Sequence, residues 1–262
     1  VIDAYEEEIE KNEDDGDLQR RLTGTVDQLY TQLINKFDPP RLSNYILYRL
    51  GDQLLERKRA DDSEKYFAEI LKRDDTSYRE EALFSMATLK SQRGDEEAIA
   101  ILQELIENYP NDSKLQQRAI GQLADSFMGF RRWQEGNQTW RDYLKKFGNG
   151  NRTIEATFKI GLSHEKMDQP GDALGAYSQV FGVDPGFLEY SVPAWMNSAN
   201  IFWTGGEKQN AYDTLHSMLK KVGHLEKDDP SGGIAEAREK LDLWGSDPAV
   251  VAKPLVEQEE GE

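Results

Sequence analysis

The sequence predicts an all-α protein: a right-handed α-solenoid of about five helix-turn-helix hairpins, closed by a C-terminal capping helix. Three observations predict it. A small residue flanked by apolar residues recurs every 36 to 38 positions, a matching second helix follows each recurrence, and Gly, Pro, Asn or Asp breakers separate the helices. The modest hydrophobic fraction of 37% suits a thin array in which every helix exposes a polar face.

The first helix of each predicted hairpin is marked by the small residue at which its partner helix can approach. Aligned on this residue, the segments place Gly51, Ala87, Ala124, Gly161 and Ala199 at the same position. The second helix carries a small residue, a large residue four positions on, and a third residue three positions further, all on one helical face. These triplets are Ser63/Phe67/Ile70, Ala98/Leu102/Leu105, Gly136/Trp140/Tyr143, Ala173/Tyr177/Val180 and Ala211/Leu215/Met218.

Turn signals complete the hairpins and set the boundaries of the array. Gly94-Asp95, Gly171-Asp172 and Gly206-Glu207 are predicted to connect the two helices of their hairpins. We expect a leading helix over 18–40, the second half of an earlier repeat, then the solenoid over 41–230 and a capping helix over 231–245. The acidic ends, 1–17 and 246–262, are expected to be disordered, because they combine low hydrophobicity with like charge.

Composition excludes several classes of function. The net charge is −17 and the acidic excess is concentrated at the two ends, so no basic stripe is available for a nucleic-acid backbone. No apolar run approaches the roughly 20 residues that a membrane-spanning helix needs. With no cysteine in the chain, disulfides, thiolate catalysis and cysteine-based zinc sites are excluded.

The repeated hairpins resemble the tetratricopeptide repeat (TPR) family. Its pattern is a large residue, then Leu-Gly, Tyr, Ala, Phe and Pro. It is met at Trp195, Leu50-Gly51, Ile160-Gly161, Ala98, Ala173, Ala211, Phe67, Tyr177, Pro110 and Pro185, whereas His164 stands at the Tyr position of its repeat. The period exceeds the family's 34 residues. In this respect the repeats are similar to those of bacterial cell-envelope members, namely outer-membrane-assembly lipoproteins and Tol-Pal-associated proteins. That likeness implies the periplasm or envelope rather than the cytoplasm, although cytosolic scaffolds can show the same features.

No catalytic, cofactor or metal site is predicted. The three histidines are never spaced three or four apart, so they do not form a ligand pair on one helix face. His164 is expected to pack between helices, and His216 and His224 to lie on the surface. The acidic doublets lack the spacing of a calcium loop, and we interpret them as helix caps and solvated turns.

The concave groove is the remaining candidate site. In the related repeats the first helices line this groove, and carrying their inward positions over to this chain gives an aromatic and apolar surface. We predict that a partner protein contacts Tyr45, Tyr48, Phe84, Arg118, Phe158, Met196, Asn200 and Trp203. An alternative is that curvature of the superhelix buries Tyr48, Phe84 and Phe158 against neighbouring repeats.

These features favour a non-enzymatic scaffold that binds an apolar peptide or helix of another protein in its groove, with a role in bacterial envelope assembly. A self-associating structural protein, a homo-oligomer, is the second hypothesis. A superhelical cell-wall glycosidase is the third, and Asp52, Asp125 and Glu165 are the carboxylates it could use.

Overall fold

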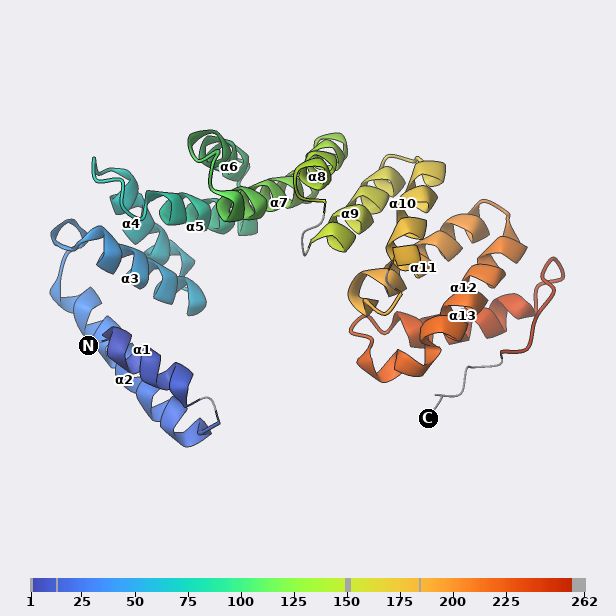
Figure 1. The fold of residues 1–262 in the computed structure, drawn as a ribbon, viewed down its shortest axis with the longest axis horizontal. Helices are drawn as coiled ribbons and strands as arrows, with labels where there is room; N and C mark the ends of the chain where they lie inside the picture. Colours follow the sequence, from blue (N-terminus) through green and yellow to red (C-terminus); the bar gives the residue numbers. More distant parts are fainter. Residues whose placement is uncertain (1, 13, 149–151, 184, 256–262) are drawn as a thin grey trace. The chain divides into compact units, whose positions relative to one another are not determined.

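The computed structural model describes residues 2–12, 14–148, 152–183 and 185–255. Over these ranges the chain is all-α (Figure 1). It divides into two compact units, Val1–Pro110 and Asn111–Glu262. The first unit contains α1 (Ile2–Lys11), α2 (Gly16–Lys36), η1 (Pro39–Arg41), α3 (Asn44–Glu56), α4 (Ala60–Leu71), α5 (Arg79–Gln92) and α6 (Glu97–Asn108). The second contains α7 (Ser113–Gly129), α8 (Trp133–Phe147), α9 (Thr153–Lys166), α10 (Pro170–Val183), α11 (Leu188–Thr204), α12 (Lys208–Val222), η2 (Gly223–Asp228) and α13 (Gly233–Gly245).

The predicted hairpins are confirmed. In the first unit α3 pairs with α4 and α5 with α6; in the second, α7 pairs with α8, α9 with α10 and α11 with α12. All the residues of the five second-helix triplets are buried, and so is the small residue of each first helix. The pattern of spacings in the sequence therefore identifies the seam along which the two helices of each hairpin pack.

Side-chain size is matched across this seam. A Cβ atom on Gly51 would lie 2.7 Å from the Phe67 ring, and one on Gly161 would lie 2.7 Å from the Tyr177 ring. In the α7/α8 hairpin the glycine is on the second helix instead, and a Cβ atom on Gly136 would lie 2.6 Å from Met128 Cγ. The hairpins whose large residue is leucine, α5/α6 and α11/α12, carry alanine at both small positions. Glycine thus occupies one of the two small positions in each hairpin whose large residue is aromatic.

One backbone conformation connects the helices of every hairpin. The residue seven positions after each small residue has a positive φ, between +56° and +85°, and these residues are Lys58, Gly94, Arg131, Asp168 and Gly206. The backbone N–H of the following residue then bonds to a carbonyl of the first helix, as in Arg59 N–H to Leu54 O at 2.8 Å. Gly94 and Gly206 are turn residues as predicted. Gly171 and Asp172 are not, because the turn falls at Asp168 and α10 has already begun at Pro170.

The N-terminal segment differs from the expectation of disorder over 1–17. Residues Ile2–Lys11 form α1, which packs on α2. Ile2, Tyr5 and Ile9 lie on one side of α1 and pack against the core of the first unit, so α1 is amphipathic despite its many carboxylates. Helix α2 supplies the predicted leading helix.

The C-terminal part agrees with the expectation in one respect and differs in another. Helix α13 lies at the predicted capping position, and Ile234, Ala237, Leu241 and Trp244 are buried in the core that α11 and α12 share with it. Residues 246–255, expected to be disordered, instead follow α13 and make hydrogen bonds to α12. The rest of that predicted tail, 256–262, lies outside the described residues. No helix in the described ranges has the length and apolar character to cross a membrane.

Candidate functional site

The first unit gathers three tyrosines at the start of its first helices. Tyr45 and Tyr48 lie one turn apart on α3, and Tyr78 precedes α5. The Tyr78 ring centroid lies 5.7 Å from that of Tyr45 and 5.5 Å from that of Tyr48, and all three side chains remain half-buried. Such offset ring pairs add to the energy of apolar burial. The structure therefore brings together two of the predicted groove residues. Phe84, a third, lies half-buried on α5 of the same unit.

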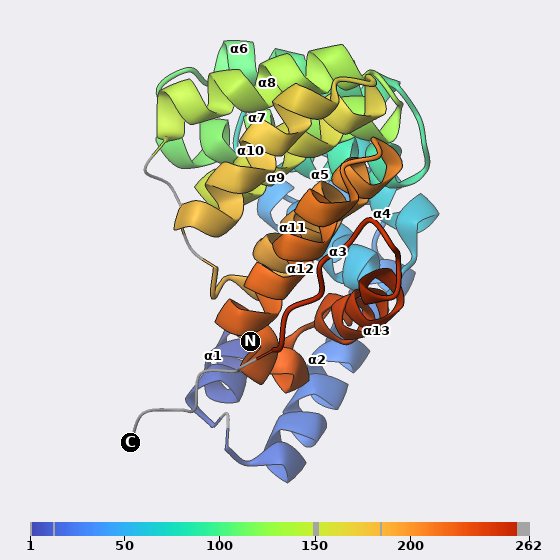
Figure 2. The ribbon, with the colours of Figure 1, turned by 90° about the vertical axis from the view of Figure 1, so that its right-hand side faces the viewer.

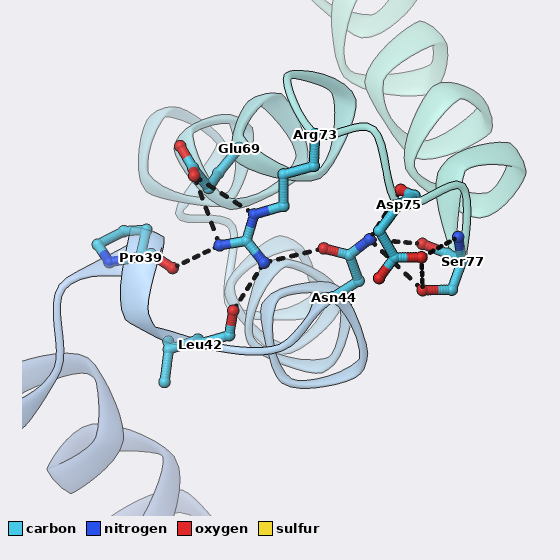
Figure 3. A network of polar contacts seen from close by, with 7 residues as sticks. All are labelled: Pro39, Leu42, Asn44, Glu69, Arg73, Asp75 and Ser77. Carbon is cyan, nitrogen blue, oxygen red and sulfur yellow. Dashed lines mark hydrogen bonds and ion pairs between the residues drawn. The ribbon is translucent and has the colours of Figure 1, made fainter.

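A half-buried arginine binds the segment that leads into α3 (Figure 3). Arg73 donates to the carbonyl of Leu42 at 2.7 Å, to that of Pro39 at 3.1 Å and to Asn44 Oδ1 at 3.0 Å. Its guanidinium also pairs with Glu69 at 3.4 Å. Because one cation binds three acceptors between Pro39 and Asn44, the entry into α3 is held against the end of α4.

Asn44 continues this network toward Tyr78. Its side chain, 2% exposed, donates to the backbone carbonyls of Asp75 and Ser77 at 3.1 and 2.9 Å (Figure 3). The Asp75 carboxylate accepts from the Ser77 N–H and hydroxyl, and these bonds lower its pKa below the usual value. The residue next in the chain is Tyr78, in the left-handed conformation at φ +61°. The network therefore sets the position from which Tyr78 reaches the α3 tyrosines.

An apolar pocket adjoins Tyr45. It has a volume of about 360 Å³ and is lined by residues of α1, α2 and α3: Ile2, Asp3, Leu29, Tyr30, Gln32, Leu33, Lys36, Phe37, Tyr45, Ile46 and Arg49. The Tyr45 hydroxyl donates to Asp3, which connects α1 to α3 across the pocket. Phe37, 37% exposed, presents an aromatic ring at the end of α2. A concave, mainly apolar surface with a few charged groups is the usual form of a binding site.

The second unit repeats the aromatic arrangement. The Phe158 ring of α9 lies 5.7 Å from Tyr177 of the same hairpin and 5.7 Å from Tyr190 of α11. Burial raises the pKa of the Tyr177 and Tyr190 hydroxyls above the usual value. Tyr190 corresponds to Tyr78, because each lies nine positions before the small residue of its first helix. Sequence reasoning missed both, although that shared spacing could have identified them.

In the α9/α10 hairpin an arginine takes the corresponding position, nine residues before Gly161. Arg152 places its guanidinium 5.0 Å from the Trp140 ring centroid and against Gly121 of α7, where a Cβ atom would overlap it. It also pairs with Glu155 at 2.6 Å and with Asp125 at 3.3 Å, and the hydrogen bond to Glu155 raises its pKa further. Asp125, one of the carboxylates considered for a glycosidase, is thus a partner of Arg152 and, at 3.2 Å, of Lys159.

The remaining predicted groove residues divide between exposed and covered positions. Arg118 is exposed on α7. The other three, Met196, Asn200 and Trp203, lie on α11 and contact α13. Met196 is 6% exposed in the core, Asn200 accepts from Lys240 at 2.7 Å, and the Trp203 ring stacks on Trp244 at 4.3 Å. The capping helix therefore covers the positions that the prediction assigned to a partner.

The histidines have structural surroundings. His164 is 8% exposed, lies 2.9 Å from Arg141 and 2.6 Å from Gln169, and so packs between helices as predicted. His224 is exposed, also as predicted. His216 was expected on the surface but is 9% exposed, because the segment after α13 covers it. Within the described ranges, no group of three or more His, Asp or Glu side chains is placed to hold a metal ion.

Comparisons with known proteins support the repeat assignment. The model of a tetratricopeptide repeat matches residues 81–112. Similar solved structures include MamA, at TM-score 0.58 and 18% identity over 70% of this chain and 94% of that one. They also include YrrB, described as a TPR protein with an unusual peptide-binding site. Its TM-score is 0.54 and its sequence identity 14%, over 81% of this chain and 98% of YrrB. PilF of Pseudomonas aeruginosa is similar at a TM-score of 0.52 and 13% sequence identity, over 77% of this chain and 88% of PilF.

Among curated protein sequences, none matches this chain. The fold comparisons agree with the packed triplets and with the repeated left-handed turn between paired helices. The tandem hairpins therefore have the fold of tetratricopeptide-repeat solenoids, and the segment 81–112 carries the sequence pattern of that repeat.

Proposed function

We propose that the protein is a non-enzymatic scaffold that binds a partner protein, and that its first unit takes an apolar helical segment of the partner in the pocket between α1, α2 and α3. The juxtaposition of Tyr45 with this pocket carries the proposal. Tyr45 belongs to the tyrosine cluster, Tyr45, Tyr48 and Tyr78, and also lines the 360 Å³ pocket. One continuous surface therefore offers both aromatic rings and an apolar recess. The peptide-binding site named in the description of YrrB supports peptide binding by this fold.

The chemistry of the lining defines the ligand. Leu29, Leu33 and Ile46 form apolar walls that suit large aliphatic or aromatic side chains. Lys36 and Arg49 bring two positive charges against the single carboxylate of Asp3. An amphipathic helix with apolar residues at positions i, i+3 and i+7, flanked by acidic residues, satisfies both requirements.

Selection from a displayed peptide library tests this proposal. The native chain is compared with Phe37→Ser, which removes the exposed ring at the pocket, and with Lys36→Glu, which reverses one of its charges. Leu243→Ser is the matched control, because Leu243 is a 71% exposed apolar residue on α13. We expect acidic amphipathic peptides to be enriched on the native chain and the control and at least tenfold weaker on both pocket variants. Enrichment that is equal on all four proteins would refute the pocket as the site.

The cellular setting is proposed from the repeat length. Steps of 36 to 38 residues support a role in bacterial envelope assembly, since such lengthened repeats resemble those of envelope members. Fractionation of source cells with an antibody against the chain provides the test. Recovery in the periplasmic or envelope fraction is the expected result, and recovery in the cytosol alone would contradict it.

A further inference from the structure

The segment that follows α13 returns along α12 without forming a helix or a β-strand (Figure 2). Side chains on one face of α12 bind its backbone. Gln209 Oε1 accepts from the Val251 N–H at 2.7 Å, and the Tyr212 hydroxyl accepts from the Lys253 N–H at 3.1 Å and donates to the Lys253 carbonyl at 3.2 Å. His216 Nε2 lies 3.1 Å from the Pro254 carbonyl. These three α12 residues are spaced by three and four positions, so they form a row along the helix.

Side chains of the segment add selective contacts. Val250 and Leu255 pack against the core that α11, α12 and α13 share, whereas Val251 between them is 72% exposed. Lys253 Nζ pairs with Asp213 at 2.7 Å, and Asp213 is oriented in turn by Gln209 at 3.1 Å. Two apolar anchors therefore flank one required positive charge.

This geometry is that of a bound peptide. A capping segment needs only to cover apolar surface, and α13 already does so with Ile234 and Leu241. Here a row of polar side chains contacts the backbone of Val251, Lys253 and Pro254. Extended peptides are recognised in the same way, with main-chain bonds giving affinity and side-chain contacts giving specificity. The Lys208–Asp247 ion pair at 2.6 Å holds the entry to the segment.

We infer that the α12 face is a peptide-binding site, and that the chain's own residues Val250–Leu255 occupy it in cis. The site recognises an extended segment with an apolar residue, a lysine three positions later, and then Pro-Leu. This inference does not depend on the pocket between α1, α2 and α3. Since a tethered ligand acts at an effective concentration on the order of millimolar, a free peptide of the same chemistry binds only when the tethered one is weakened.

The test uses the full chain and a fluorescent peptide with the sequence of residues 247–255. Lys253→Glu places a like charge against Asp213 and releases the tethered segment, leaving the site itself intact. We expect the peptide to bind this variant at least tenfold more tightly than the native chain. Adding Asp213→Lys restores the tethered pair with reversed charges, so the double variant should exclude the peptide again. Lys227→Glu, on an exposed lysine of η2, is the matched control and should behave as the native chain does.

Equal peptide affinity for Lys253→Glu and Lys227→Glu would overturn the inference. Amide hydrogen exchange on the unmutated chain gives an independent readout: the Val251 and Lys253 amides should be protected, and exchange at the rate of free coil would also overturn it. A dimer of the native chain that Lys253→Glu dissociates would show that the segment binds in trans, which overturns the assignment in cis.

Discussion

Substitution of Gly161 by alanine tests the close approach of α9 and α10. The new Cβ would lie 2.7 Å from Cδ1 and Cε1 of Tyr177 and 3.3 Å from Ala176 Cβ. Carbon atoms prefer separations of about 3.5–4.0 Å, so the ring would have to move by about 1 Å. Tyr177 resists this movement, because its ring is fully buried and its hydroxyl bonds to Glu165 at 2.8 Å and to Asn197 at 3.0 Å.

The expected magnitude is a balance of two effects. Overpacking of this kind costs about 1–3 kcal/mol. Alanine in place of a helical glycine returns about 0.5–1 kcal/mol. We therefore expect Gly161→Ala to lower the free energy of unfolding by about 0–2.5 kcal/mol, the difference between these two ranges.

Urea denaturation followed by circular dichroism measures the effect, and Gly24→Ala is the matched control. Gly24 lies inside α2 with no atom within 4 Å of its added Cβ, so only the helix-propensity gain applies there and stability should rise by about 0.5–1 kcal/mol. Combining Gly161→Ala with Tyr177→Leu recreates the Ala/Leu pairing of the α5/α6 and α11/α12 hairpins, and should cost less than the sum of the two single changes. Equal stabilisation by Gly161→Ala and Gly24→Ala would refute the reasoning.

Further predictions concern the turns, the loop network, the tyrosines and self-association. Arg131→Gly should raise the free energy of unfolding by about 0.5–1 kcal/mol, because Arg131 is exposed and adopts a φ of +60° that glycine tolerates; urea denaturation checks it. Arg73→Met should lower it by about 2–3 kcal/mol in the same assay, since the carbonyls of Pro39 and Leu42 lose their donor. Tyr177 has a pKa raised above 10.0, so the stability that it contributes is complete below pH 10 and is lost as the pH rises further; Tyr177→Phe should lessen alkaline unfolding, monitored by circular dichroism across that range. Sedimentation velocity over a concentration series should show a monomer if the chain is a partner-binding scaffold, and a concentration-dependent oligomer would favour the structural hypothesis instead.

The hairpins could be predicted from sequence because their packing is local and periodic. The contact between Gly51 and Phe67, sixteen positions later, can be predicted because the same combination of a glycine and a large aromatic residue recurs at Gly161 and Tyr177. The tyrosine cluster could be predicted only in part. Tyr78 sits in a connection, and its position depends on Arg73 and on Asn44 of α3, which no periodicity relates to it.

The structure of the two ends does not follow from their composition. In α1, Ile2, Tyr5 and Ile9 form an apolar stripe among many acidic residues, and average hydropathy hides that stripe. The segment after α13 binds in part through backbone groups, which any sequence possesses. Its contact with His216 also explains why that histidine is buried rather than exposed.

The left-handed turn of the five hairpins has a consequence for insertions and deletions. In every hairpin the turn residue with positive φ lies seven positions after the small residue of the first helix. The lengths of successive repeats, in contrast, differ by up to two residues. An added residue before the turn would rotate the rest of the first helix by about 100° and move its apolar stripe out of the seam. Length variation is therefore expected to accumulate in the connections between hairpins, and a tag inserted at Gly186, in the loop between α10 and α11, should be tolerated where one beside Arg131 is not.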